Sequence, residues 1–169
     1  MLISHLSLLL LRVISVKLVL LRISTFTHSF YRYTCFQMFK SSPTGLAADR
    51  IYFNENEDFV TKTVGTEYKL RSEVIEALYV LHETTEDPIY VEWGWEIFES
   101  IMKNCKTEGG FAAYRDVKSK EGDLVDEVQS FFPAKTLKYL YLLVSPKRVV
   151  ELKKVLFTNG GHMLPISIE

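Results

Sequence analysis

The segment that most constrains the fold is PIYVEWGWEIFESIMKNC, at residues 88–105. At the helical period of about 3.6 residues, its large apolar side chains fall into two rows. The first row holds Trp93, Ile97 and Ile101, and the second holds Trp95, Phe98 and Met102. Because both rows are apolar, we expect a helix that is buried between neighbouring helices, which requires a multi-helix architecture.

Other segments show the same helical spacing of apolar residues. Further helices are predicted at residues 73–86, 130–144 and 149–157. Asp87 is the expected N-cap of the helix that begins at Pro88, because proline is favoured at the first helical position. Residues 111–117 read as a short strand and residues 158–169 as an extended tail. The chain is therefore predicted to be mainly α, with helical hairpins and minor β structure.

Charge divides the chain into two parts that differ in kind. Residues 1–50 carry a net charge of +5 and residues 51–169 a net charge of −6, although the total is only −1. A near-zero total argues against a nucleic-acid-binding protein. The SSPTG stretch at residues 41–45 is typical of a break in structure, so we expect a non-domain segment at 1–44 and a domain at 45–169.

The most apolar stretch, LSLLLLRVISVKLVLLRIS, lies within residues 1–24. A membrane-spanning helix needs about 20 largely apolar residues, but Arg12, Lys17 and Arg22 are spread around this one. Each such charge costs about 2.5–3.5 kcal/mol near a bilayer centre. Three interpretations stay open: membrane association or a signal role through residues 1–24, an apolar arm that packs on the protein, and a segment that is not native coding sequence for the domain.

Two cysteines, Cys35 and Cys105, leave the redox state open. They could pair in an oxidising compartment or remain as two buried thiols. The sequence holds no CxxC or HExxH pattern, which argues against a zinc site.

The stretch LRSEVIEALY, at residues 70–79, allows two interpretations. Ser72 can cap a helix, and acidic Glu73 and Glu76 in a first turn suit the helix dipole, so the stretch reads as an ordinary helix start. Alternatively, Arg71 and the two carboxylates face a substrate.

Six stretches in order carry a family resemblance over about 120 residues. They are GLAADRIYFN, YKLRSEVIEALY, DPIYVEWGWEIFESI, CKTEGGFAAYRDV, SFFPAKTLKYLYLLVS and LFTNGGHMLPI. Together they resemble glycoside hydrolase family 47, the class I α-1,2-mannosidases. The resemblance implies the last helical elements and closing tail of an (α/α)7 barrel, and therefore a partial barrel for residues 45–169.

The resemblance also implies an activity, a cofactor and a location. Members of this family trim α-1,2-linked mannose from oligomannose N-glycans on glycoproteins, with inversion, and a bound Ca2+ orients the sugar hydroxyls. We therefore expect an endoplasmic reticulum or Golgi location. The processing and degradation-signalling branches of the family are not separated by these residues.

Four residues match the family's sugar site. Glu73 matches the carboxylate at the reaction centre, where it would act as the base. Arg71, Glu76 and Phe131 match substrate-binding positions. Phe131 is equally suited to an ordinary core position, and Glu73 to a solvated helix start.

Other positions depart from the family. Ser72 replaces a proline, Lys135 replaces a pocket glutamate, and Asn159 and Gly160 replace the Thr-Glu pair of the calcium loop. Asn159 still offers oxygen ligands, whereas His162 is expected to be structural.

The acid and base of an inverting glycosidase are separate carboxylates, about 6.5–9.5 Å apart. The family's other essential carboxylates lie in earlier barrel helices, which residues 1–44 do not resemble. Three hypotheses follow: a mannosidase fragment that is inactive alone, a catalytically degenerate glycan-binding or interaction remnant, and an incomplete gene product. Marginal stability is expected, with apolar faces such as the Trp93 row left uncovered.

Overall fold

The computed structural model describes residues 33–52, 64–121 and 123–166. The chain divides into one unit over Met1–Thr34 and another over Cys35–Glu169, and the second unit is described below. The segment predicted to associate with membranes, residues 1–24, lies outside the described residues. Within the described ranges, no helix has the length and apolar character needed to cross a bilayer.

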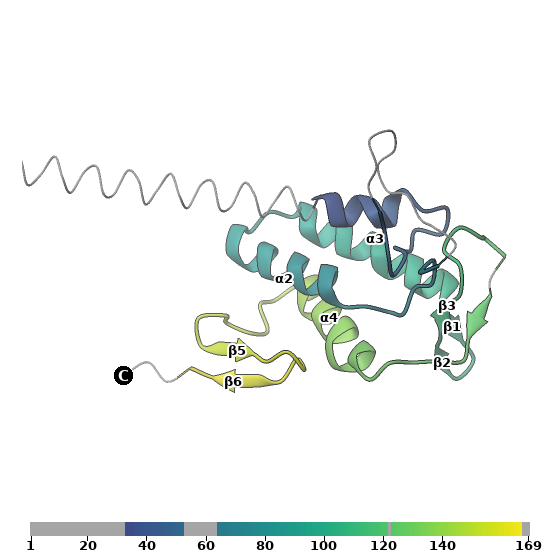
Figure 1. The fold of residues 1–169 in the computed structure, drawn as a ribbon. Helices are drawn as coiled ribbons and strands as arrows, with labels where there is room; N and C mark the ends of the chain where they lie inside the picture. The colour runs from purple at the N-terminus through teal and green to yellow at the C-terminus, as the bar shows by residue number, and fades with distance from the viewer. Residues whose placement is uncertain (1–32, 53–63, 122, 167–169) are drawn as a thin grey trace, which may run out of the picture. The chain divides into compact units, whose positions relative to one another are not determined.

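Three helices form the centre of this unit. They are α2 (Glu73–Thr85), α3 (Ile89–Asn104) and α4 (Lys138–Val144), and each packs against the other two (Figure 1). A π-helical turn, η1 (Phe132–Leu137), leads directly into α4. Pro133 lies in this turn and has no N–H to donate, which is compatible with a widened first turn. The predicted helices at 73–86, 88–105 and 130–144 are thus confirmed.

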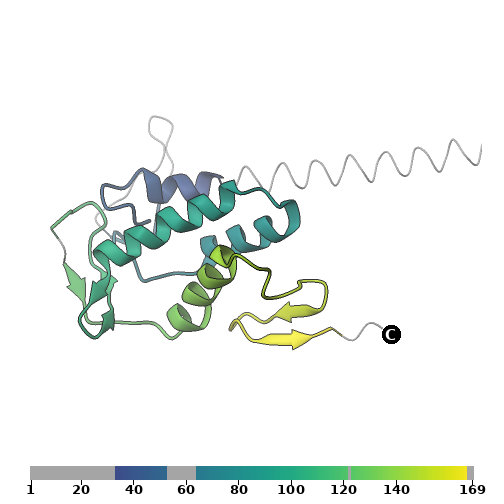
Figure 2. The same ribbon diagram turned by 180° about the vertical axis from the view of Figure 1, so that it is seen from behind.

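Helical residues 35–40 lie alongside α3, as the view from behind makes clear (Figure 2). The ring of Phe36 stacks on Trp93, with 4.6 Å between ring centroids and 8° between the ring planes. Tyr90 meets the same indole edge-on at 5.6 Å. Trp93 is therefore half-buried between aromatic neighbours.

The two apolar rows of α3 are covered to different degrees. Ile97 and Ile101 are 1% and 0% exposed, whereas Trp95 is 46% exposed. The prediction that the helix is buried on both rows is therefore wrong for Trp95, and the expected uncovered face is not the Trp93 row. Trp95 instead borders an apolar pocket that it lines together with Phe98 and Tyr141 of α4.

Among the residues that the structure describes, six short strands pair into three antiparallel two-stranded sheets. The pairs are β1 (Lys106–Thr107) with β2 (Gly110–Phe111), β3 (Ala113–Tyr114) with β4 (Leu124–Val125), and β5 (Val155–Phe157) with β6 (Met163–Pro165). The strand predicted at 111–117 is therefore split between β2 and β3.

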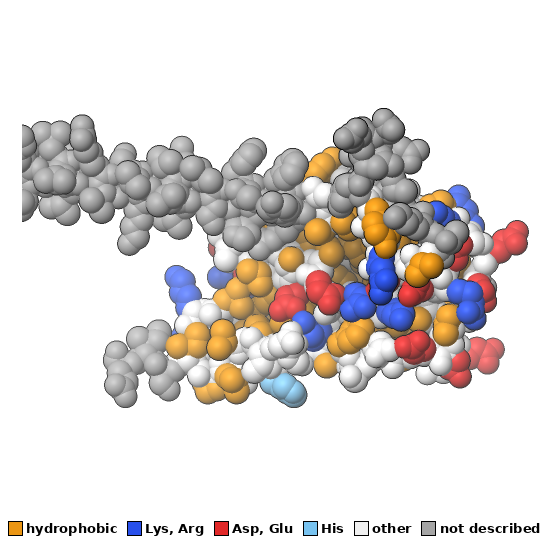
Figure 3. Space-filling view, viewed as in Figure 1, with side chains coloured by type: hydrophobic (Ala, Val, Ile, Leu, Met, Phe, Trp, Pro, Cys, Tyr) orange, Lys and Arg blue, Asp and Glu red, His pale blue; other side chains and the backbone are white. Residues whose placement is uncertain are grey.

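The helix predicted at residues 149–157 is wrong, because residues 155–157 form β5. Leu156 lies opposite Leu164 of β6, so this segment makes its backbone hydrogen bonds across the hairpin. Hydrophobic side chains gather over this hairpin (Figure 3), and Leu156, Met163 and Leu164 are each about half exposed.

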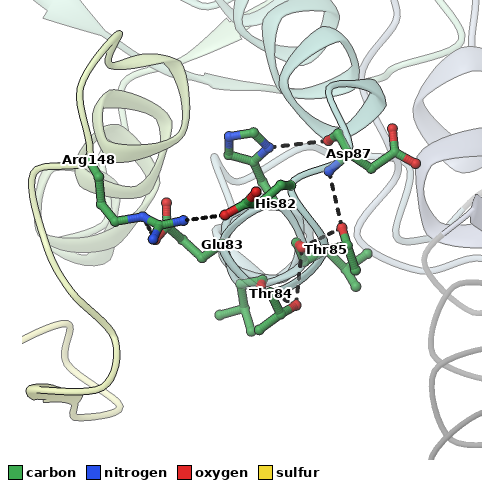
Figure 4. A network of polar contacts seen from close by, with 9 residues as sticks. His82, Glu83, Thr84, Thr85, Asp87 and Arg148 are labelled. Atoms are coloured by element: carbon green, nitrogen blue, oxygen red, sulfur yellow. Dashed lines mark hydrogen bonds and ion pairs between the residues drawn. The ribbon is translucent and has the colours of Figure 1, made fainter.

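The turn between α2 and α3 is held by a polar network (Figure 4). The N-cap of α3 is Pro88, one residue later than predicted, and the Asp87 Oδ1 atom accepts from the backbone N–H of Ile89 at 3.0 Å. The Asp87 N–H donates to Thr85 Oγ1 at 3.3 Å. Beyond the turn, Arg148 Nε pairs with Glu83 Oε2 of α2 at 2.8 Å, which ties the segment after α4 back to α2.

Candidate active site

The candidate site begins at a strained residue just before α2. Leu70 has φ of 58° and is fully buried. A left-handed backbone is unfavourable for a branched side chain and needs support from its surroundings. Thr136 supplies it, because its buried Oγ1 donates to the Leu70 carbonyl oxygen at 2.8 Å. The turn η1 therefore fixes the segment from which Arg71 and Glu73 project.

Arg71 pairs mainly with Asp49 rather than with Glu73. Its Nη2 atom lies 3.1 Å from Asp49 Oδ2 and its Nε atom bonds Asp49 Oδ1, whereas Nη1 lies 4.0 Å from Glu73 Oε1. The hydrogen bond from Arg71 holds the pKa of Asp49 below its usual value, although burial opposes the shift. The Glu73 side chain is 66% exposed.

Ser72 stands at the N-cap position of α2 but makes no side-chain cap hydrogen bond. Its φ of −102° and ψ of −15° are helical, and a capping side chain normally requires the β region. Ser72 is instead 2% exposed, and its carbonyl oxygen accepts from the Glu76 N–H at 2.8 Å. The expected hydroxyl cap is therefore wrong.

Glu76 is engaged by two residues of η1 and α4. Lys135 Nζ lies 2.8 Å from Glu76 Oε2, and Tyr139 Oη donates to Glu76 Oε1 at 3.1 Å. The Lys135 side chain is 10% exposed and that of Glu76 is 33% exposed. Burial and then the Glu76 charge raise the pKa of Tyr139, so its hydroxyl remains a donor. Acidic and basic side chains adjoin over α2 and α4 in Figure 3.

Phe131 and Phe132 have different environments. Phe132 is 3% exposed and packs on Phe111 with 4.9 Å between ring centroids, which makes it a core residue. Phe131 is half-buried at the entrance to η1. Its contact with a bound sugar stays a prediction.

Asn159 lies on the exposed loop between β5 and β6. The loop is closed by Thr158, whose N–H donates to the His162 carbonyl oxygen at 2.9 Å and whose Oγ1 accepts from the His162 N–H at 3.1 Å. The structural role of the His162 side chain stays a prediction. The role of Asn159 as a calcium ligand stays a prediction.

The structure thus brings Arg71 and Glu73 together and places Glu76 against Lys135. Sequence reasoning missed two partners, Asp49 and Tyr139. No local pattern links Asp49 to Arg71, which is 22 residues away. Tyr139 could have been found, because a residue four positions after Lys135 lies on the same helix face.

Comparison with known proteins decides the ancestry of these residues. The sequence profile described as "Glycosyl hydrolase family 47" matches residues 29–166. The chain belongs to glycosyl hydrolase family 47. The match begins ahead of the boundary expected at residue 45, and that boundary stays a prediction.

The relatives are considerably longer than this chain. The mannosyl-oligosaccharide 1,2-alpha-mannosidase MNS1 of Arabidopsis thaliana is 40% identical over 135 residues, covering 79% of this chain and 23% of that protein. The mannosyl-oligosaccharide 1,2-alpha-mannosidase IC of Homo sapiens is 39% identical, covering 79% of this chain and 21% of that protein. The family 47 chain therefore spans less than a quarter of the length of these two relatives.

A solved structure shows the same fold. The alpha-1,2-mannosidase from Trichoderma reesei matches with a TM-score of 0.69 and 21% identity, over 78% of this chain and 32% of that one. The predicted fold class, a mainly α part of an (α/α)7 barrel with minor β, is confirmed.

Proposed function

We propose that this chain is the C-terminal portion of an α-1,2-mannosidase domain that retains Glu73 as a catalytic carboxylate and does not hydrolyse mannosides by itself. The names of the relatives and the family membership support the reaction class. The expected substrate is an oligomannose N-glycan on a glycoprotein. The expected location is the endoplasmic reticulum or Golgi, in keeping with a mouse relative named as an endoplasmic reticulum mannosidase.

The observation that carries the proposal is the ion pair between Glu76 and Lys135. Each Glu76 oxygen already accepts from a protein donor, Lys135 or Tyr139, so sugar hydroxyls would have to compete with both. A buried lysine at this position also places positive charge where the family resemblance implies a carboxylate.

The lowered pKa of Asp49 also supports the proposal that the chain does not hydrolyse mannosides by itself. An inverting glycosidase needs a protonated acid and an ionised base. Glu73 is exposed and can serve as the base, but the nearby Asp49 has a lowered pKa through its bond to Arg71. A carboxylate stabilised in its ionised form cannot donate a proton at neutral pH. Asp49, which pairs with Arg71, therefore does not supply the protonated acid that hydrolysis needs.

The decisive experiment incubates the purified full chain with an oligomannose glycan that carries α-1,2-linked mannose. Loss of hexose is followed by mass spectrometry, with the human relative IC as positive control and Glu73→Gln as matched negative control. We expect no mannose release above that of the Glu73→Gln variant. Release that disappears in Glu73→Gln would refute the proposal and make the chain an enzyme in its own right.

One observation favours the alternative, a glycan-binding remnant. A small cavity of about 110 Å³ lies beside the candidate site and is lined in part by Asp49, Tyr68, Arg71 and Glu73. An NMR titration with α-1,2-mannobiose tests this function directly. Saturable shifts of the Arg71 and Glu73 amides without hydrolysis would favour binding, whereas unchanged spectra would exclude it.

A further inference from the structure

The loop between β5 and β6 is packed tightly against η1. Gly161 is buried with φ of +75°, and a Cβ atom there would lie 2.6 Å from the Ala134 carbonyl oxygen and 3.1 Å from Lys135 Cγ. Lys138 Nζ also donates to the Gly161 carbonyl oxygen at 2.6 Å. The loop is therefore attached to η1 and α4 by direct contact and by a charged hydrogen bond.

Lys135 links this attachment to α2. Its stem contacts the loop at Gly161, and its Nζ atom reaches Glu76 Oε2 at 2.8 Å. Lys135 and Lys138 thus connect three parts of the fold, namely α2, the π-helical turn with α4, and the β5–β6 loop. Burying a lysine is unfavourable unless its charge is paired, which the Glu76 carboxylate achieves.

The surroundings of Gly161 and Glu76 do not fit a bound Ca2+. Ca2+ takes about 6–8 oxygen ligands, with carboxylates prominent among them. Here the Gly161 carbonyl and one Glu76 oxygen already accept from lysines. In the part of the chain that the structure describes, no group of three or more His, Cys, Asp or Glu residues could hold a metal ion.

We propose that Lys135 and Lys138 attach the β5–β6 loop of this chain to the helices, so that its attachment is independent of Ca2+. Lys135 compensates the charge of Glu76, and Lys138 holds the Gly161 carbonyl oxygen. A divalent cation brought to the same place would meet two positive charges and be repelled. The proposal concerns the attachment of the loop and does not depend on catalytic activity.

The test measures thermal unfolding of the full chain in millimolar CaCl2, in equimolar MgCl2 and in EDTA. We expect the same Tm in all three buffers for the natural sequence. Lys138→Met keeps the apolar stem but removes the donor to Gly161, and it should lower Tm by about 3–6 °C in every buffer. Lys135→Met should behave in the same way.

Lys135→Glu tests the role of the Lys135 charge more directly than the two methionine variants do. It places a second carboxylate beside Glu76, and like charges this close repel each other. We expect a lowered Tm in EDTA that CaCl2 partly restores and MgCl2 restores less. If Lys135→Glu does not fold, hydrogen exchange of the β5–β6 amides in Lys138→Met provides the second readout, with loss of protection expected.

Three results would overturn the proposal. The first is a saturable rise of Tm with CaCl2 over MgCl2 for the natural sequence, which would reveal a calcium site. The second is unchanged Tm and unchanged amide protection in both methionine variants. The third is a folded Lys135→Glu variant that shows no response to CaCl2.

Discussion

Ile101→Ala tests whether three helices of this chain form a core of their own. Ile101 is fully buried on the covered face of α3. The change removes three carbons, which lose about 2.4 kcal/mol of burial. The incompletely filled cavity adds to this cost, and the higher helix propensity of alanine offsets about 0.4 kcal/mol. We therefore expect the free energy of unfolding to fall by about 2–4 kcal/mol.

Two further variants provide reference values for the loss of stability expected for Ile101→Ala. Val149 is 53% exposed, so Val149→Ala removes two carbons from the surface and should change stability by less than about 0.5 kcal/mol. Ile101→Val removes one buried carbon and should cost about 1 kcal/mol, which keeps the test usable if Ile101→Ala unfolds a marginally stable chain.

The assay is urea unfolding followed by far-UV circular dichroism at several protein concentrations. Concentration independence excludes a contribution from self-association through the exposed Trp95 surface of α3. A loss of less than about 1 kcal/mol for Ile101→Ala, or an equal loss for Val149→Ala, would refute the packing described for α3.

The remaining predictions concern the segments around the candidate site. Asp49→Asn should lose about 0.5–1 kcal/mol at neutral pH, because Arg71 is its ionic partner. The pKa of Asp49 is lowered from 3.8, so this stabilisation is present above 3.8 and is lost as pH falls through the folded value. The free energies of unfolding of the natural sequence and of Asp49→Asn, measured in urea, should converge as the pH falls. A difference that stays constant with pH would contradict the ion pair. Thr136→Val should cost about 1–2 kcal/mol by removing the donor to the buried Leu70 carbonyl, and Thr136→Ser, which keeps the hydroxyl, should cost less in the same assay. Gly161→Ala should lower the free energy of unfolding by about 1–3 kcal/mol, since φ is +75° and the Cβ would meet a backbone oxygen; an unchanged thermal transition would contradict this geometry.

Helical periodicity predicted α2, α3 and the η1–α4 segment, because each has a continuous apolar face that any packing must bury. Asp87 could be recognised as an acceptor at the start of α3 for a similar reason, since such hydrogen bonds join residues two or three positions apart. The helix predicted over 149–157 failed because β5 depends on pairing with β6, which local spacing does not report.

The candidate site could be predicted only in part. Family resemblance identified Arg71, Glu73 and Glu76, but the partners of two of these side chains come from distant segments. Asp49 forms an ion pair with the guanidinium of Arg71, and Lys135 forms an ion pair with Glu76. Such pairs depend on which elements meet in space, and a linear pattern holds no information about their distance.

The order of amino acids alone determined where α2, α3 and α4 lie, which family the chain resembles and where its charges differ from that family. Tertiary packing alone decided that Trp95 of α3 is exposed, that Leu70 adopts a left-handed backbone, and that two lysines meet the β5–β6 loop. The physical reason is the separation along the sequence over which each interaction acts. Helix formation is governed by contacts within about four residues, whereas burial and ion pairing depend on segments brought together by the whole fold.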